Sequence, residues 1–180
     1  FPEDPSSYGI LAEYLTEIGR NSYARSVYEG MLKEDPENGL ILLSYAEFYI
    51  RKNNVDSAFI LYRSAICCSD LNHEAKINLV VSLINNREFI RKNGNRVIEL
   101  LNTFPRESND FRIYAAYADV YINNEDYTSA APYLDTALIF EKSNFMLWEQ
   151  TILVNNYLSN HEAVIDISKE CIQYFPDKPN

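Results

Sequence analysis

The apolar positions of this chain recur with the period of a helix. Between residues 42 and 65, apolar or small side chains fall mostly three and four residues apart in two runs separated by polar residues. The runs consist of Leu42, Tyr45, Ala46 and Tyr49, followed by Val55, Ala58, Tyr62 and Ala65. This spacing places each run on one face of an α-helix. The pattern therefore predicts two short amphipathic helices joined by a turn near Asn53.

The same two-helix pattern is repeated along the whole chain. A second clear copy contains Tyr114, Tyr117, Ala118 and Tyr121, followed by Tyr127, Ala130, Leu134 and Ala137. The repeats end at Pro36, Asp70, Pro105, Lys142 and Pro176. These end residues are spaced 34, 35, 37 and 34 residues apart. This period predicts a single all-α domain over residues 1–180, built from five helical hairpins. We expect the hairpins at about 5–38, 39–72, 73–107, 111–144 and 145–178, with turns near Gly19, Asn53, Asn86, Asn124 and Ser159.

Two positions break the regularity of the predicted second helices. The third repeat has one extra residue near Asn93 and Gly94, and glycine inside a helix costs ~1 kcal/mol relative to alanine. Pro132 falls inside the second helix of the fourth repeat, where it removes one backbone hydrogen bond. We expect a break or bulge at the first position and a bend at the second.

The repeated two-helix pattern resembles the tetratricopeptide repeat (TPR), because it has small residues such as Ala46 and Ala58 where two helices cross. The last repeat, with its segments 148–150 and 174–177, is similar to large TPR proteins of bacterial envelopes. The resemblance implies a right-handed superhelical solenoid of about five repeats and a function in protein–protein interaction. It also implies that the first helices of the repeats line a concave groove that receives an extended or helical peptide.

Carried onto this chain, the groove positions are apolar with scattered acids. The candidate groove residues are Glu13, Leu43, Glu47, Ile50, Ile77, Val81, Ile84, Asp119, Ile122, Glu149 and Leu153. TPR domains that clamp a carboxylate tail use lysine, asparagine and arginine at such places, whereas this chain has acids. A carboxylate would be repelled, so the predicted partner is a neutral to basic protein or peptide with apolar anchors.

Charge and composition narrow the function classes. The net charge of −10 argues against nucleic acid and against adsorption on an anionic membrane. No apolar run is long enough to insert into a membrane. His73 and His161 lie far apart, Cys67 and Cys68 are adjacent, and neither pair has the spacing of a metal site. We expect no metal, no cofactor and no catalytic residue.

The sequence predicts a non-catalytic interaction scaffold, and two alternatives stay open. The chain could be a structural spacer or oligomerisation segment, or a regulatory TPR module of a longer multidomain protein. It begins at Phe1, and the last repeat leaves Val164, Ile167, Cys171 and Ile172 without a following helix, so we expect further repeats of its own chain beyond Asn180. The resemblance suggests a periplasmic or cell-envelope location, with the cytoplasm as the alternative.

Overall fold

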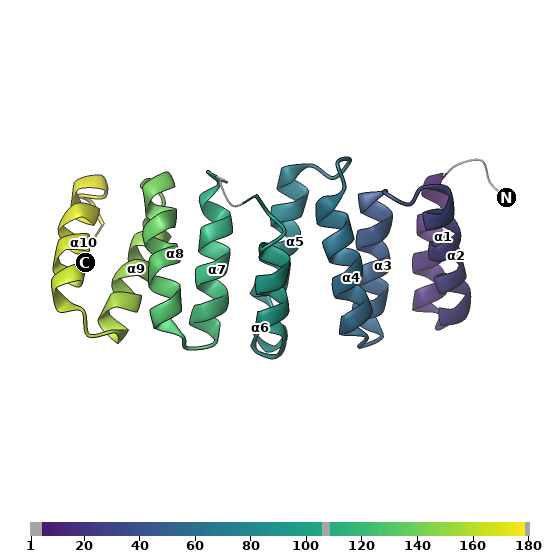
Figure 1. Cartoon of the computed structure of the whole chain (residues 1–180), viewed down its shortest axis with the longest axis horizontal. Helices are drawn as coiled ribbons and strands as arrows, with labels where there is room; N and C mark the ends of the chain where they lie inside the picture. The colour runs from purple at the N-terminus through teal and green to yellow at the C-terminus, as the bar shows by residue number, and fades with distance from the viewer. Residues whose placement is uncertain (1–4, 106–108, 179–180) are drawn as a thin grey trace. The chain divides into compact units, whose positions relative to one another are not determined.

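The computed structural model describes residues 5–105 and 109–178, and within them the chain folds into ten α-helices and no strand (Figure 1). The helices are α1 (Pro5–Glu17), α2 (Asn21–Glu34), α3 (Gly39–Arg51), α4 (Val55–Cys67), α5 (His73–Asn85), α6 (Arg87–Leu101), α7 (Phe111–Asn123), α8 (Tyr127–Phe140), α9 (Phe145–Tyr157) and α10 (His161–Tyr174). The all-α fold class predicted from the sequence is confirmed.

Short polar residues set the ends of the helices. The side chains of Asn38, Asn54 and Asn86 each accept a hydrogen bond from the first turn of the helix that follows. Such caps satisfy backbone N–H groups that have no partner inside the helix. Within several hairpins the turn contains one residue with positive φ; these residues are Gly19 (75°), Asn53 (56°), Glu125 (61°) and Ser159 (57°). The five turns therefore fall where the sequence predicts them.

The contacts divide the chain into two compact units, residues 1–76 and 77–180. In the first unit α1 packs on α2 and α3 packs on α4, and α2 also contacts α3. Ala12, Ala24, Ala46 and Ala58 have no exposed surface, as expected for methyl groups at helix crossings. The core between the two hairpins is aromatic, because Tyr28 of α2 stacks on a tyrosine of α3.

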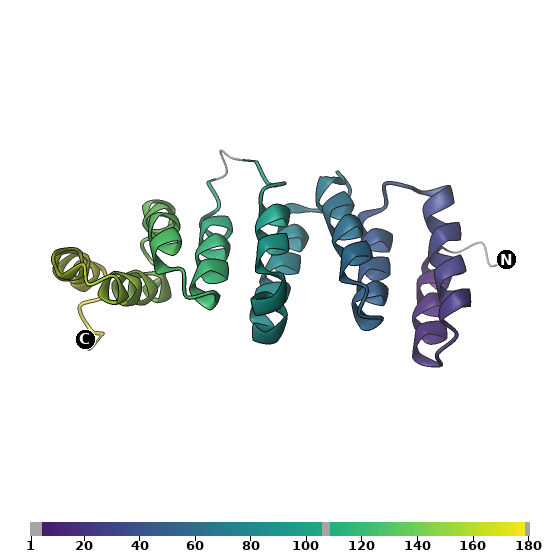
Figure 2. The same ribbon diagram turned by 60° about the horizontal axis from the view of Figure 1, so that its bottom comes forward.

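The second unit contains the hairpins α7–α8 and α9–α10, which Figure 2 shows side by side. Ala118 and Ala130 have no exposed surface, and Trp148 is 2% exposed. The indole N–H of Trp148 donates a hydrogen bond to the backbone oxygen of Lys142 at 2.9 Å, and the ammonium of Lys142 lies 2.6 Å from Glu170. These contacts tie the connection between α8 and α9 to the last helix.

The predicted break near Asn93 and Gly94 is wrong, because α6 runs without interruption through both residues. Gly94 is buried against α7. A Cβ atom there would lie 2.7 Å from the side-chain nitrogen of Asn124 and 3.3 Å from a methyl carbon of Val120. Glycine thus lets α7 approach α6 closely, and the packing offsets its low helix propensity.

Two other expectations have different outcomes. The helix α8 is continuous across Pro132, and the bend predicted there stays a prediction. Of the four residues expected to form an uncovered end face, Cys171 is 3% exposed and belongs to the core, whereas Ile172 is 42% exposed. The expected continuation of the chain beyond Asn180 lies outside the described residues.

Candidate functional site

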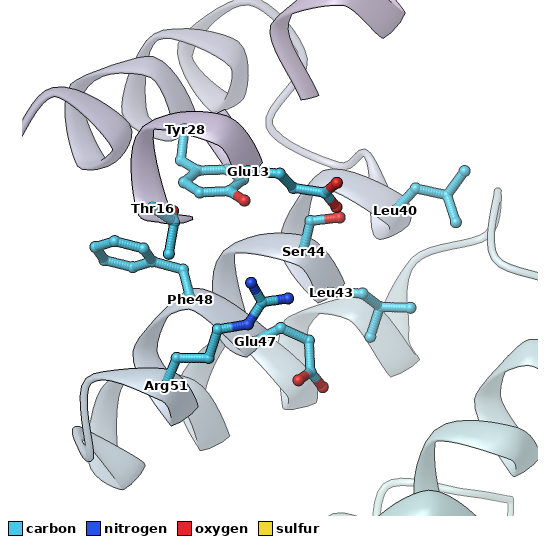
Figure 3. Close-up of a pocket in the computed structure, with 9 residues that line it drawn as sticks. All are labelled: Glu13, Thr16, Tyr28, Leu40, Leu43, Ser44, Glu47, Phe48 and Arg51. Carbon is cyan, nitrogen blue, oxygen red and sulfur yellow. The ribbon is translucent and has the colours of Figure 1, made fainter. Parts of the chain in front are cut away.

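The larger of two hollows described below lies on the first-helix face of the first unit (Figure 3). Its volume is about 290 Å³, and it is bounded by α1, α2 and α3. We call it the α1/α3 hollow. It is lined by Glu13, Thr16, Tyr28, Leu40, Leu43, Ser44, Glu47, Phe48 and Arg51. It contains one cation and two carboxylates, with apolar side chains around them.

Helix α3 supplies one wall of the hollow. Leu40, Leu43, Glu47 and Arg51 follow one another at steps of three and four residues, so they share one face of the helix. Leu40 is 65% exposed, which leaves a large apolar side chain at the rim with no cover. This wall therefore offers apolar surface at one end and charged groups at the other.

Tyr28 forms the buried wall and is held there by aromatic packing. Its ring lies 4.8 Å from the ring of Tyr45 with an angle of 14° between the planes, and 5.8 Å from the ring of Phe48. The Tyr28 side chain is 2% exposed, yet it lines the hollow. Burial raises the pKa of the Tyr28 hydroxyl, the charge of Glu13 raises it further, and Arg51 acts in the opposite direction. The hydroxyl therefore remains a proton donor at neutral pH.

Four polar side chains of this hollow form no hydrogen bond or ion pair with any other residue that the structure describes. They are Glu13, Tyr28, Ser44 and Arg51. Figure 3 shows the Arg51 guanidinium and the Glu13 carboxylate extending into the hollow from different helices. Glu47 differs, because its carboxylate accepts a hydrogen bond from the Tyr62 hydroxyl at 2.7 Å. The α1/α3 hollow thus contains donors and an acceptor that are free to bind something else.

A smaller hollow of about 120 Å³ lies between α5 and α7 in the second unit, and we call it the α5/α7 hollow. It is lined by Val81, Ile84, Asn85, Arg112, Ala115, Ala116 and Asp119. Its charged groups already have partners. The Arg112 guanidinium lies 2.8 Å from a carboxylate oxygen of Asp110, and the carboxylate of Asp119 accepts a hydrogen bond from the Gln150 side chain at 2.9 Å. Burial raises the pKa of Asp119, and the hydrogen bond from Gln150 opposes this shift.

The structure divides the predicted groove residues into groups. The α1/α3 hollow brings Glu13, Leu43 and Glu47 together, and the α5/α7 hollow brings Val81, Ile84 and Asp119 together. Ile50 and Ile122 are half-buried, and Glu149 and Leu153 are exposed on α9 without lining either hollow. Ile77 is 3% exposed, belongs to the core and lines neither hollow.

Sequence reasoning missed several residues of the α1/α3 hollow, above all Tyr28 and Arg51. Tyr28 lies on a second helix, whereas only first helices were expected to line the groove. Arg51 lies in the last turn of α3, where a cation is favourable for the helix itself. The available signal was the four-residue step from Glu47 to Arg51, which places both on one face.

The described residues contain no group of three or more metal-type ligands, and none of the described helices is long and apolar enough to cross a membrane. The sequence matches no protein-family model and no curated protein.

Solved structures show a clear similarity of fold. YrrB, described as a TPR protein with an unusual peptide-binding site, is 15% identical, with a TM-score of 0.55 over 97% of this chain and 88% of its own. The C-terminal part of a TPR repeat-containing protein from Cytophaga hutchinsonii is 12% identical, with a TM-score of 0.62 over 95% of this chain and 67% of its own. PilW, described as a type IV pilus biogenesis factor, is 15% identical, with a TM-score of 0.51 over 99% of this chain and 81% of its own.

These similarities define the class of fold. The helices of the chain form TPR-type hairpins, and the structures that it resembles are TPR solenoids. The chain therefore has the tetratricopeptide fold that the spacing of its small and apolar residues predicts.

Proposed function

We propose that this chain is a non-catalytic interaction module that binds a peptide or protein segment in the α1/α3 hollow. The observation that carries the proposal is the combination of exposed apolar side chains and unpaired polar groups in one concave place. Leu40 is 65% exposed at the rim, and Glu13 and Arg51 have no ion-pair partner among the described residues. Burial of the apolar rim would supply most of the affinity, at ~25 cal/mol per Å² before ordering costs.

The charges of the hollow favour a segment that is neutral to basic overall. Glu13 and Glu47 give it two negative charges against the single positive charge of Arg51. The chain as a whole carries a net charge of −10, so its long-range field attracts basic segments and repels acidic ones. Electrostatics of this kind affects association rate and partner choice more than final affinity. Nucleic acid, with its dense negative charge, does not fit this field.

A peptide selection tests the proposal directly. The full chain would be used to select from a library of dodecapeptides with blocked termini, and the affinity of the selected peptides would be measured by calorimetry at low and high salt. We expect the variant Glu13→Lys/Glu47→Lys to bind a selected basic peptide at least about tenfold more weakly at low salt. Glu34→Lys is the matched control, because Glu34 is an exposed acid at the end of α2 outside the hollow. Equal binding by all three proteins would contradict the site.

A second candidate function is stacking on another helical hairpin, and it rests on α1. Leu11 is 42% exposed and Tyr14 is 56% exposed, whereas Tyr45 and Phe48, 34 residues later at the equivalent positions of α3, are each 5% exposed. In α3 these positions are covered by Tyr28 of the preceding second helix. The α1 face therefore fits the second helix of another hairpin, whether in the same chain or in a partner.

A fusion tests this candidate. A copy of residues 5–38 joined in front of the chain would place a second α2 where it can cover α1. We expect this fusion to raise the free energy of unfolding, and Tyr14→Glu in the original α1 to remove the gain, as measured by urea denaturation. A fusion without any gain in stability would contradict the candidate.

A cell-envelope location is also part of the proposal. It is supported by the fold similarity to PilW, described as a pilus biogenesis factor, and by the resemblance of the last repeat to envelope TPR proteins. Fractionation of the producing cells, followed by antibody detection, tests it. Recovery of the chain with cytoplasmic markers alone would contradict this location.

A further inference from the structure

The polar groups of the α1/α3 hollow restrict the chemistry of the side chain that it can accept. Its free donors are the Tyr28 hydroxyl, the Ser44 hydroxyl and the Arg51 guanidinium, and its free acceptor is the Glu13 carboxylate. Two of them, Glu13 and Arg51, carry opposite charges and come from different helices, α1 and α3. Figure 3 shows both extending into the same hollow.

Tyr28 is the observation that makes this a built site rather than a pair of surface charges. Its side chain is only 2% exposed, and two aromatic contacts, with Tyr45 and Phe48, fix the orientation of the ring within the core. The hydroxyl nevertheless forms no hydrogen bond with a described residue and lies at the wall of the hollow. A rigid, unpaired donor in a concave place contributes to binding without an ordering cost of its own.

Charged side chains fit this arrangement poorly. Glu47 is already bonded to Tyr62, so the unpaired charges are Glu13 and Arg51. Between these two, a partner's lysine or arginine would gain from Glu13 and be repelled by Arg51, and a partner's aspartate or glutamate would gain from Arg51 and be repelled by Glu13. An aliphatic side chain would leave every polar group of the hollow without a partner. The fitting group is neutral and has a donor on one side and an acceptor on the other.

We propose that the α1/α3 hollow is a subsite for the primary carboxamide of a partner's asparagine or glutamine side chain. The carboxamide NH₂ donates to the Glu13 carboxylate, and its oxygen accepts from Arg51 and the Tyr28 hydroxyl. Leu40 and Leu43 at the rim contact the aliphatic part of the same side chain and its neighbours. This subsite rests on the proposed function, because it names what one position of the bound segment must carry.

The experiment uses the full chain and the blocked dodecapeptide library. The wild-type protein should select peptides that share one position enriched in asparagine or glutamine and depleted in charged residues. Replacing glutamine by glutamate or by lysine in a selected peptide should weaken binding at least about tenfold, because each change leaves one group of the hollow facing a like charge.

Two variants should move this preference in opposite directions. Glu13→Lys leaves two cations and the hydroxyl donors around the carboxamide position, and the remaining carboxylate of the hollow, Glu47, already accepts a hydrogen bond from Tyr62, so the preference should change to acidic residues. Arg51→Glu leaves an acidic surrounding, so the preference should change to lysine or arginine. The controls are Glu17→Lys and Lys52→Glu, which make the same changes at exposed positions outside the hollow and should keep the amide preference.

The outcomes separate the two proposals. If the wild-type protein selects no peptide, the proposed function fails together with the subsite. If it selects peptides but shows a charged or apolar preference at every position, or if Glu13→Lys and Arg51→Glu leave the preference unchanged, the subsite is overturned and the proposed function stands.

Discussion

The α1/α3 and α5/α7 hollows are built from the same kind of surface and differ in how their polar groups are used. Both lie on first helices and both contain acidic and basic side chains. In the α5/α7 hollow, Asp119 is bound by Gln150 and Arg112 is paired with Asp110. In the α1/α3 hollow, Glu13, Ser44, Tyr28 and Arg51 have no hydrogen bond or ion pair within the described residues. A hollow whose charged groups are paired internally stabilises the fold, whereas charged groups without such a partner are available to a binding partner.

The largest difference between the hollows should be seen in stability. Asp119→Lys buries a cation at a half-buried position and removes the acceptor of the Gln150 hydrogen bond, so we expect a loss of about 3 kcal/mol in the free energy of unfolding. Glu13→Lys, on the exposed side of α1, should change the free energy of unfolding by no more than about 0.5 kcal/mol. Urea denaturation monitored by circular dichroism measures both. Similar losses in the two variants would break the comparison.

Two tyrosines give a matched test with a smaller effect. Tyr62→Phe removes the hydrogen bond to Glu47 and leaves the ring in place, so it should cost about 1 to 2 kcal/mol. Tyr28→Phe removes a hydroxyl that has no hydrogen-bond partner, so its cost should be within about 0.5 kcal/mol. Tyr28→Phe should instead weaken the binding of a selected peptide by about threefold to tenfold. A large stability loss at Tyr28 combined with unchanged peptide affinity would show that its hydroxyl is structural.

The smallest expected effect concerns pH and Asp119. Because burial raises the pKa of this carboxyl, the folded state favours its protonated form more than the unfolded state does. The stabilising contribution is therefore present below the unfolded value of about 4 and is lost as the pH rises through the folded pKa. Asp119→Asn keeps an acceptor for Gln150 and removes the charge, so it should stabilise the protein by up to about 1 kcal/mol at pH 7.

The check is the difference in unfolding free energy between the wild-type protein and Asp119→Asn, measured at pH 7 and pH 4. The gain from the substitution should be smaller at pH 4, where more of the wild-type carboxyl is protonated. A gain that is equal at both pH values, or a loss at pH 7, would show that burial does not control this carboxyl.

The helices could be predicted from the sequence because each signal is local. Ala46 and Ala58 mark a helix crossing by their size, and Asn38 and Asn54 mark helix starts by their hydrogen-bonding chemistry. Gly94 misled the prediction because local propensity argues for a break there. Its role depends on α7, which begins 17 residues later and packs onto it through Val120 and Asn124.

The residues that line the α1/α3 hollow could be predicted only in part, for a related reason. The resemblance to TPR domains implied that Glu13, Leu43 and Glu47 lie on the groove face of the first helices. It could not show that Tyr28, from a second helix, reaches the same hollow, because that depends on the stacking of its ring on Tyr45. Nor could it show which polar groups have partners, since the hydrogen bond between Asp119 and Gln150 joins residues 31 positions apart.

The measurement that tests the central claim most directly is amide hydrogen exchange of the full chain with and without a peptide selected from the blocked library. The account predicts slower exchange in α1 and α3, around Glu13, Ser44 and Arg51, and no change in the segments of α5 and α7 that line the other hollow. It also predicts that Glu13→Lys abolishes the protection and that Glu17→Lys preserves it. Protection confined to α5 and α7, or protection of α1 and α3 that survives Glu13→Lys, would contradict the assignment of the α1/α3 hollow as the binding site.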